Sequence, residues 1–141
     1  MIEDATINGK PLKIWGARLL SGTTEALLAP PSMKDYIRNE SRLEHGEHVV
    51  VGNARFASRE VSIPVMIEGS SKTDYIKKYM SFVEELRNGN VALYIPDLGK
   101  TYSLAYLSCG KYGSFGECRS KLMIKFLEPE PWMNNYRLNY D

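Results

Sequence analysis

The clearest pattern in the chain is an alternation of apolar and polar residues along 61–68. Successive side chains of a strand point to opposite faces, so this pattern predicts a half-buried strand. Its core face would carry Val61, Ile63, Val65 and Ile67. Pro64 lies on the other face and has no amide hydrogen. It therefore indicates a strand at a sheet edge, a bulge, or a position whose amide side faces solvent.

A helix is expected over 71–87. Ser71 can accept a hydrogen bond from an unpaired amide of the first turn, and Asp74 suits the positive end of the helix dipole. Glycine at position 89 can adopt the left-handed conformation that ends a helix. Apolar residues recur at spacings of three and four, which predicts one stripe packed on the sheet: Ile76, Tyr79, Met80, Val83 and Leu86.

Three more strands are predicted, over 91–95, 101–108 and 119–127, separated by a Pro-Asp-Leu-Gly turn and by a glycine-rich turn over 110–116. The last strand alternates again, with its core face formed by Leu122, Ile124 and Phe126. Together these segments predict a mainly β fold, either a β-sandwich or an open barrel, with one helix packed against it.

The first third of the chain is less regular. Residues 5–15 read as two short extended pieces around Asn8-Gly9, a pair that suits a two-residue hairpin turn. Residues 21–32 contain Pro30-Pro31 and predict a surface loop. Residues 33–51 predict two strands in a long polar hairpin, or an arm that reaches away from the core. We interpret this segment as an assembly arm, with candidate contact residues Tyr36, Arg38, Arg42, Glu44 and Glu47.

Length and charge narrow the class of protein. The 141 residues fit one domain over 1–132 with an extension over 133–141. Hydrophobic residues make up 43% and charged residues 25%, as in ordinary globular proteins. The formal net charge of +1 offers no global attraction for nucleic acid or an anionic membrane. No signal peptide or membrane-spanning run is seen, so we expect synthesis in the cytoplasm.

Candidate chemistry is sparse. Cys109 and Cys118 flank the glycine-rich turn and could face each other across a hairpin, although reduced thiols are favoured in a cytoplasmic chain. His45 and His48 lack the helical spacing and the third ligand typical of zinc sites. The glycine-rich turn precedes a strand, whereas a phosphate loop precedes a helix. Aromatic residues are expected to pack in the core or at subunit contacts. We therefore expect no catalytic residue, metal or cofactor, and no enzyme.

The order of these elements resembles the N-terminal domain of phage distal tail proteins. The features that carry the resemblance are Ile7-Asn8-Gly9, the strand over 59–67, the helix over 71–87, the hairpin over 91–108, and the closing Phe-Leu-Glu-Pro-Glu-Pro-Trp of 126–132. The resemblance implies a fold like that of tail-tube proteins. It also implies a hexameric ring that joins the tail tube to the baseplate or tip.

From that resemblance we expect a structural protein of a phage or prophage virion tail, assembled in the bacterial cytoplasm from copies of itself and other tail proteins. DNA would pass through the ring without specific binding, and no membrane would be involved. Many distal tail proteins continue into a second, often carbohydrate-binding-like domain, whereas this sequence stops at Asp141, so the resemblance does not imply binding to the host surface. The alternatives are a tail-tube or tube-terminator protein of the same fold, and a small carbohydrate-binding module.

Overall fold

The computed structural model describes residues 4–33, 37–40, 47–50 and 57–131. Strand is the largest class of secondary structure in the described chain, as expected. The elements are, in chain order, β1 (Thr6–Ile7), β2 (Lys10–Pro11), the 3-10 helix η1 (Leu12–Trp15), β3 (Ala17–Leu19), α1 (Thr23–Leu28), β4 (Ile37–Glu40), β5 (Glu47–Val50), β6 (Arg59–Glu68), α2 (Lys72–Leu86), β7 (Asn90–Ile95), β8 (Lys100–Ser114) and β9 (Arg119–Glu128).

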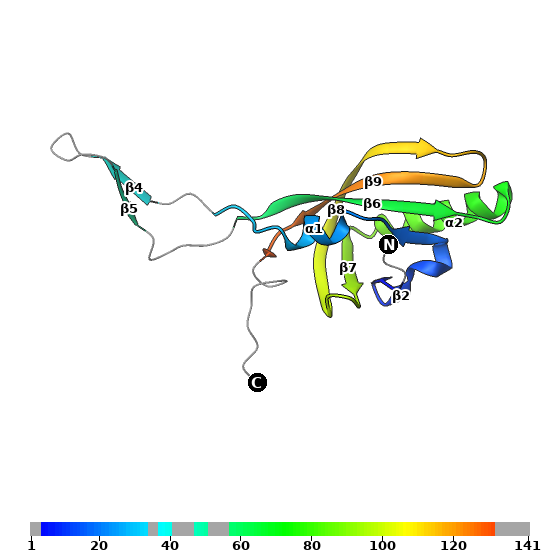
Figure 1. The fold of residues 1–141 in the computed structure, drawn as a ribbon, viewed down its shortest axis with the longest axis horizontal. Coiled ribbons are helices and arrows are strands. Elements are labelled where there is room, and N and C mark those ends of the chain that lie inside the picture. Colours follow the sequence, from blue (N-terminus) through cyan, green and yellow to red (C-terminus); the bar gives the residue numbers. More distant parts are fainter. Residues whose placement is uncertain (1–3, 34–36, 41–46, 51–56, 132–141) are drawn as a thin grey trace.

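Seven strands form one antiparallel sheet in the order β2-β1-β7-β8-β9-β6-β3 (Figure 1). In a flat sheet, six spacings of about 4.8 Å would hold the outer strands ~29 Å apart. Only residues 12–16 connect β2 to β3, and they span at most roughly 20 Å. The sheet must therefore curl until its edges approach each other. A strand was expected over 11–15, but the segment instead forms η1, whose Leu12 and Trp15 are buried between the edges.

The predicted mainly β class is thus confirmed, with the curled sheet closer to the open barrel than to the β-sandwich. Its longest ladder joins β6 to β9 over ten residue pairs, from Arg59 opposite Glu128 to Glu68 opposite Arg119. The core faces predicted for both strands are confirmed. Val61, Ile63, Val65 and Ile67 meet Leu122, Ile124 and Phe126 in one buried cluster.

Pro64 lies where the ladder between β6 and β3 ends. The Leu20 amide donates to the Pro64 carbonyl at 2.9 Å, but Pro64 has no amide to return the bond. The Leu20 carbonyl instead accepts a hydrogen bond from the Thr23 hydroxyl at 2.9 Å. Thr23 starts α1, so the loop expected over 21–32 contains a short helix. Its buried side is formed by Thr23 and Leu27, one helical turn apart.

Helix α2 begins as predicted, since the Asp74 amide donates to the Ser71 hydroxyl at 3.1 Å. Gly89, at φ 83°, follows its end. The predicted apolar stripe was largely wrong: Ile76, Met80 and Val83 are 42%, 57% and 39% exposed. The buried residues of the helix are instead Tyr75, Phe82, Glu85 and Leu86. The helix packs against η1, where the rings of Trp15 and Phe82 lie edge to face with their centroids 5.8 Å apart. This contact determines which side of the helix is buried.

The glycine-rich segment was also predicted incorrectly. Strand β8 continues through it to Ser114, with irregularities in its register at Leu107 and Gly110, and the turn to β9 lies beyond. Glycine and bulges are compatible with a strand that bends, which explains why the sequence resembled a turn. Cys109 is opposite Ile124 in the ladder and Cys118 lies in the turn. The two do not face each other, and both are free thiols.

Candidate assembly surfaces

The predicted arm is present as a hairpin of its own. Strands β4 and β5 pair in a separate two-stranded sheet, and Figure 1 shows them projecting from the seven-stranded sheet. Of the candidate contact residues, Arg38 lies on β4 and Glu47 on β5. Tyr36, Arg42 and Glu44 fall outside the described residues. The described backbone therefore confirms two strands in this segment, while the contact role of the five residues stays a prediction.

The register of this hairpin places two glutamates directly opposite each other. Ile37 pairs with Val50 at one end, and Glu40 pairs with Glu47 at the other. Like charges in a cross-strand pair destabilise a hairpin. A small two-stranded sheet is also marginal in water by itself. The outer end of the hairpin would therefore gain stability from a positively charged partner.

The root of the hairpin is fixed to the body by Arg59. Its Nε donates to the Glu128 carboxylate at 2.6 Å, and its Nη2 donates to the Leu27 carbonyl at 2.7 Å. A third bond from its Nη1 goes to the carbonyl of Ala29. One guanidinium thus joins the start of β6, the end of β9 and the last turn of α1. A planar fork of donors suits this arrangement, and lysine could not reproduce it.

Glu128 is fully buried, and a buried carboxylate is costly unless it is paired. The sequence places Glu128 in the core-facing register of β9, two residues after Phe126, which is a signal that could have revealed it. Close by, the Ala57 amide donates to the Ser32 carbonyl at 2.7 Å. The chain therefore leaves the body at Ser32 and returns at Ala57, so both ends of the arm segment start from one anchored point.

A second buried carboxylate, Glu85, ties the N-terminal turn to α2. It accepts from Lys10 Nζ at 2.6 Å and from the side-chain amides of Asn8 and Asn88, each at 2.9 Å. The Lys10 bond, followed by the Asn8 bond, holds the pKa of Glu85 below its ordinary value. Asn8 adopts φ 53°, in keeping with the predicted Asn-Gly turn.

Tyrosine hydroxyls connect the N-terminal part of α2 to strands β8 and β9. Tyr75 donates to the Ser120 hydroxyl at 2.6 Å, and its own oxygen lies 2.7 Å from that of Tyr112. Burial raises the pKa of Tyr75 to about 12. The rings of Tyr112 and Tyr79 also lie edge to face, with their centroids 5.7 Å apart. These contacts join the helix to the β8–β9 hairpin. Core packing, expected of the aromatic residues, is found for Tyr102, whereas Tyr94, Tyr112 and Phe115 are exposed.

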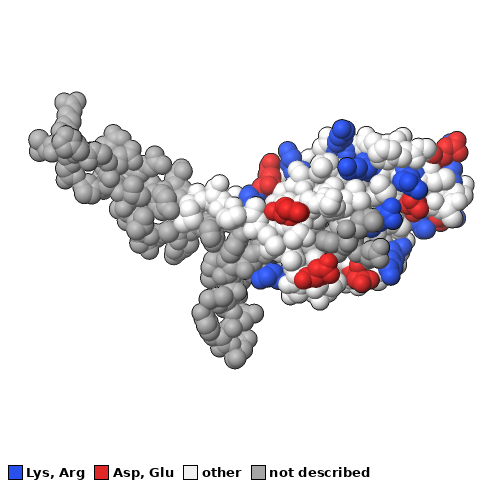
Figure 2. All heavy atoms as spheres, viewed as in Figure 1, with Lys and Arg blue, Asp and Glu red and all other residues white. Residues whose placement is uncertain are grey.

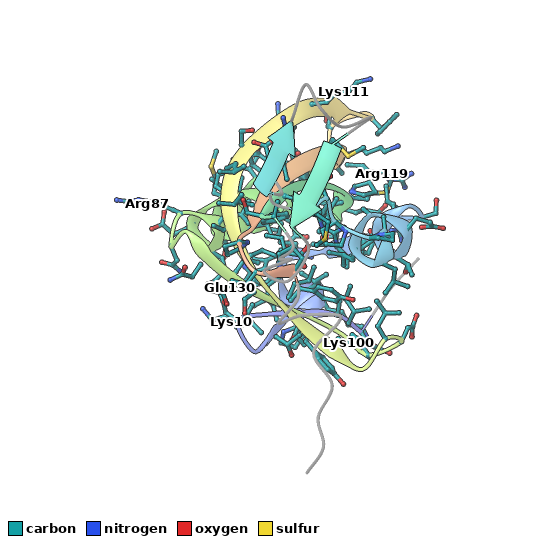
Figure 3. All side chains as sticks on the ribbon, turned by 90° about the vertical axis from the view of Figure 1, so that its left-hand side faces the viewer. Lys10, Arg87, Lys100, Lys111, Arg119 and Glu130 are labelled. Carbon is teal, nitrogen blue, oxygen red and sulfur yellow. The ribbon has the colours of Figure 1, made fainter. Side chains whose placement is uncertain are left out.

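The outer side of the β8–β9 hairpin is basic. On β9, Lys121 and Lys125 alternate with the buried residues and so face outward. Lys111 of β8 is paired in register with Met123 between them. Figure 2 shows several Lys and Arg side chains along the top of the body, where these strands run. Figure 3 looks from the arm side and shows Lys111 at the rim of the molecule, pointing away from the sheet.

A shallow hollow opens on this outer side. It holds about 240 Å³ and is lined by Lys111, Gly113, Phe115, Lys121 and Met123. Pockets for small ligands usually hold at least roughly 300 Å³ and enclose their ligand. The hollow is more open than that, and Phe115, one of its lining residues, is 56% exposed. Its volume suits one side chain of a partner better than a small molecule.

This curled sheet, with its helix and projecting hairpin, matches a solved phage protein. The crystal structure of SPP1 Dit (gp 19.1) superposes with a TM-score of 0.62 at 16% sequence identity. That protein is described as a paradigm of the hub adsorption apparatus in phages that infect Gram-positive bacteria. The match covers 91% of this chain. The fold is Dit-like.

The likeness has a defined extent. The chain spans 50% of the length of the solved Dit chain. No protein-family model matches the sequence. No curated protein sequence matches it either. The Dit-like fold agrees with the tail-tube-like architecture expected from the order of elements. The similarity to SPP1 Dit lies in the fold, because the sequence identity is low.

Within the described residues, no group of three or more His, Cys, Asp or Glu side chains is arranged to hold a metal ion. His45 is outside the described residues, and His48 lies on β5. Among the described helices, none is long and apolar enough to cross a membrane. The features that stand out are therefore an anchored hairpin and a basic outer face.

Proposed function

We propose that this protein is a structural component of a phage or prophage tail, which forms a ring between the tail tube and the baseplate or tip. The observation that carries the proposal is the Dit-like fold over 91% of the chain. The protein would act without catalysis, metal or cofactor. Its place would be the virion tail, reached by assembly in the bacterial cytoplasm.

The anchored hairpin supports a role in assembly. A projecting two-stranded sheet buries little of its own surface, and such elements gain stability when a partner covers them. Arg59 holds the point where this hairpin leaves the body. A fixed root limits the directions that the arm can take, which favours a defined contact with a neighbour. Identical subunits joined head to tail form closed rings or open filaments, depending on the rotation between them.

Electron microscopy of the purified full chain tests the proposal. We expect closed, single rings, six subunits around, at concentrations where subunits associate. Long stacked tubes would instead favour the tube protein of the same fold. Rings would have a bore that passes DNA, so we expect weak binding to duplex DNA at physiological salt, measured by fluorescence anisotropy. Tight duplex binding together with a monomeric chain would contradict the proposal.

A further inference from the structure

We infer that the outer face of the β8–β9 hairpin is the receptor for the end of the β4–β5 hairpin of a second copy of this chain. The inference rests on the proposed function and adds the surfaces that join neighbouring subunits. The occupant is the acidic segment 40–47. Its receptor is the basic face around Lys111 and Lys121, whose hollow can take one side chain of the segment. Charge and placement, taken in turn, support it.

The end of the β4–β5 hairpin is acidic. Segment 40–47 holds Glu40, Glu44 and Glu47 against one arginine, so its formal net charge is −2 with His45 neutral. Two of these glutamates are a cross-strand pair, which like charges destabilise. A cation brought to this pair would remove that repulsion. The hairpin is thus complementary to a basic surface.

Two lysines of the basic face are available to pair with a partner. Lys125 lies 3.7 Å from Glu60, but within the described part of the chain neither Lys111 nor Lys121 makes an ion pair. Both line the hollow beside the apolar side chains of Phe115 and Met123. A partner end that carries carboxylates and one apolar residue would fit such a lining. Segment 40–47 has that composition, since Leu43 is its apolar residue.

The hairpin and the basic face lie at opposite ends of one subunit, so a contact between them requires two copies. The arm leaves the body beside the Arg59–Glu128 end of the β6–β9 ladder, whereas the β8–β9 turn lies beyond the Glu68–Arg119 end. Ten strand residues at about 3.3 Å each separate these ends by ~30 Å. Figure 1 shows the β4–β5 hairpin extending from the Arg59–Glu128 end of the ladder, away from the β8–β9 turn. An arm aimed away from its own receptor reaches that of a neighbour, and such a head-to-tail contact can close a ring.

The test is a charge exchange in the full chain. Variant A carries Lys111→Glu and Lys121→Glu, and variant B carries Glu40→Lys and Glu47→Lys. Sedimentation velocity over a concentration series gives the apparent Kd of self-association. We expect A and B alone to associate about tenfold or more weakly than wild type, because each places like charges at the contact. An equimolar mixture of A and B should recover association, since each interface then pairs opposite charges.

A matched control keeps the result specific. Lys72→Glu with Lys77→Glu makes the same change of net charge on exposed positions of α2, and it should leave self-association unchanged. Circular dichroism checks that every variant is folded.

Rings that persist in A and in B would overturn the inference while leaving the proposed function intact. Duplex DNA binding lost only in A, with unchanged self-association, would assign the basic face to nucleic acid and also overturn it. A wild-type chain that stays monomeric at every concentration would overturn it as well.

Discussion

At the residue scale, two buried carboxylates join segments of the chain that are distant in sequence. Glu128 ends β9, Glu85 lies in the last turn of α2, and both side chains are buried. Each is compensated by a basic residue from a distant part of the chain, Arg59 for the first and Lys10 for the second. The alternation of β9 continues through Glu128, so its burial could have been predicted. Its partner could not, because the pairing depends on the register between β6 and β9.

Replacing Arg59 by glutamine should be strongly destabilising. The change leaves the buried Glu128 carboxylate without its cation and removes donors to the carbonyls of Leu27 and Ala29. Breaking a buried pair in this way costs about 3–5 kcal/mol. Arg87→Gln is the matched control, because the Arg87–Glu84 pair is largely exposed and worth roughly 0–1 kcal/mol. Urea unfolding measures both. Equal, small losses would show that Arg59 does not anchor the root.

Glu85 predicts a pH dependence of stability. Its pKa is lowered in the folded protein, chiefly by the hydrogen bond from Lys10. A group with a depressed folded pKa stabilises the protein above its unfolded pKa, and this contribution is lost as the pH falls through the folded value. The free energy of unfolding of Glu85→Gln should therefore lie below that of wild type at pH 7, and the gap should shrink in acid. A gap that stays constant between pH 7 and pH 3 would contradict the assignment.

At the element scale, the alternating strands β6 and β9 were predictable, whereas the short strand β3 and the buried face of the helix were not. The alternation in β6 and β9 identifies their buried sides because a strand has only two faces. The apolar residues of helix α2 form one broad band, and the sequence alone does not show which side of that band is buried. Contacts with Trp15 and Tyr112, which are distant in sequence, decide this. The same limit applies to α1 and to the long, irregular β8, whose local sequences resemble loops.

The orientation of α2 can be tested by comparing its two faces. Leu86→Ala removes a side chain that is 2% exposed and should cost about 2–5 kcal/mol. Met80→Ala, on the exposed face of the same helix, should change the free energy of unfolding by less than about 1 kcal/mol. Thermal and urea unfolding of both variants measure the difference. If Met80→Ala were the more damaging change, the helix would be turned the other way.

At the scale of the whole molecule, the order of elements in the sequence carried more information than any motif. It indicated a tail-tube-like fold, and the Dit-like fold of the structure agrees. The arm was predicted as a segment, but its acidic cross-strand pair and its basic counterpart depend on the register in two sheets. Such surfaces arise only when strands pair, so no reading of single residues could have located them.

The central claim is that the chain is a ring component at the end of a phage tail. The most direct measurement is gold labelling of an epitope-tagged copy in particles produced by a strain that carries this gene. Electron microscopy should show the label at one position, where the tail tube meets the baseplate or tip. Label along the whole tail would indicate a tube protein, and particles without label would contradict the claim.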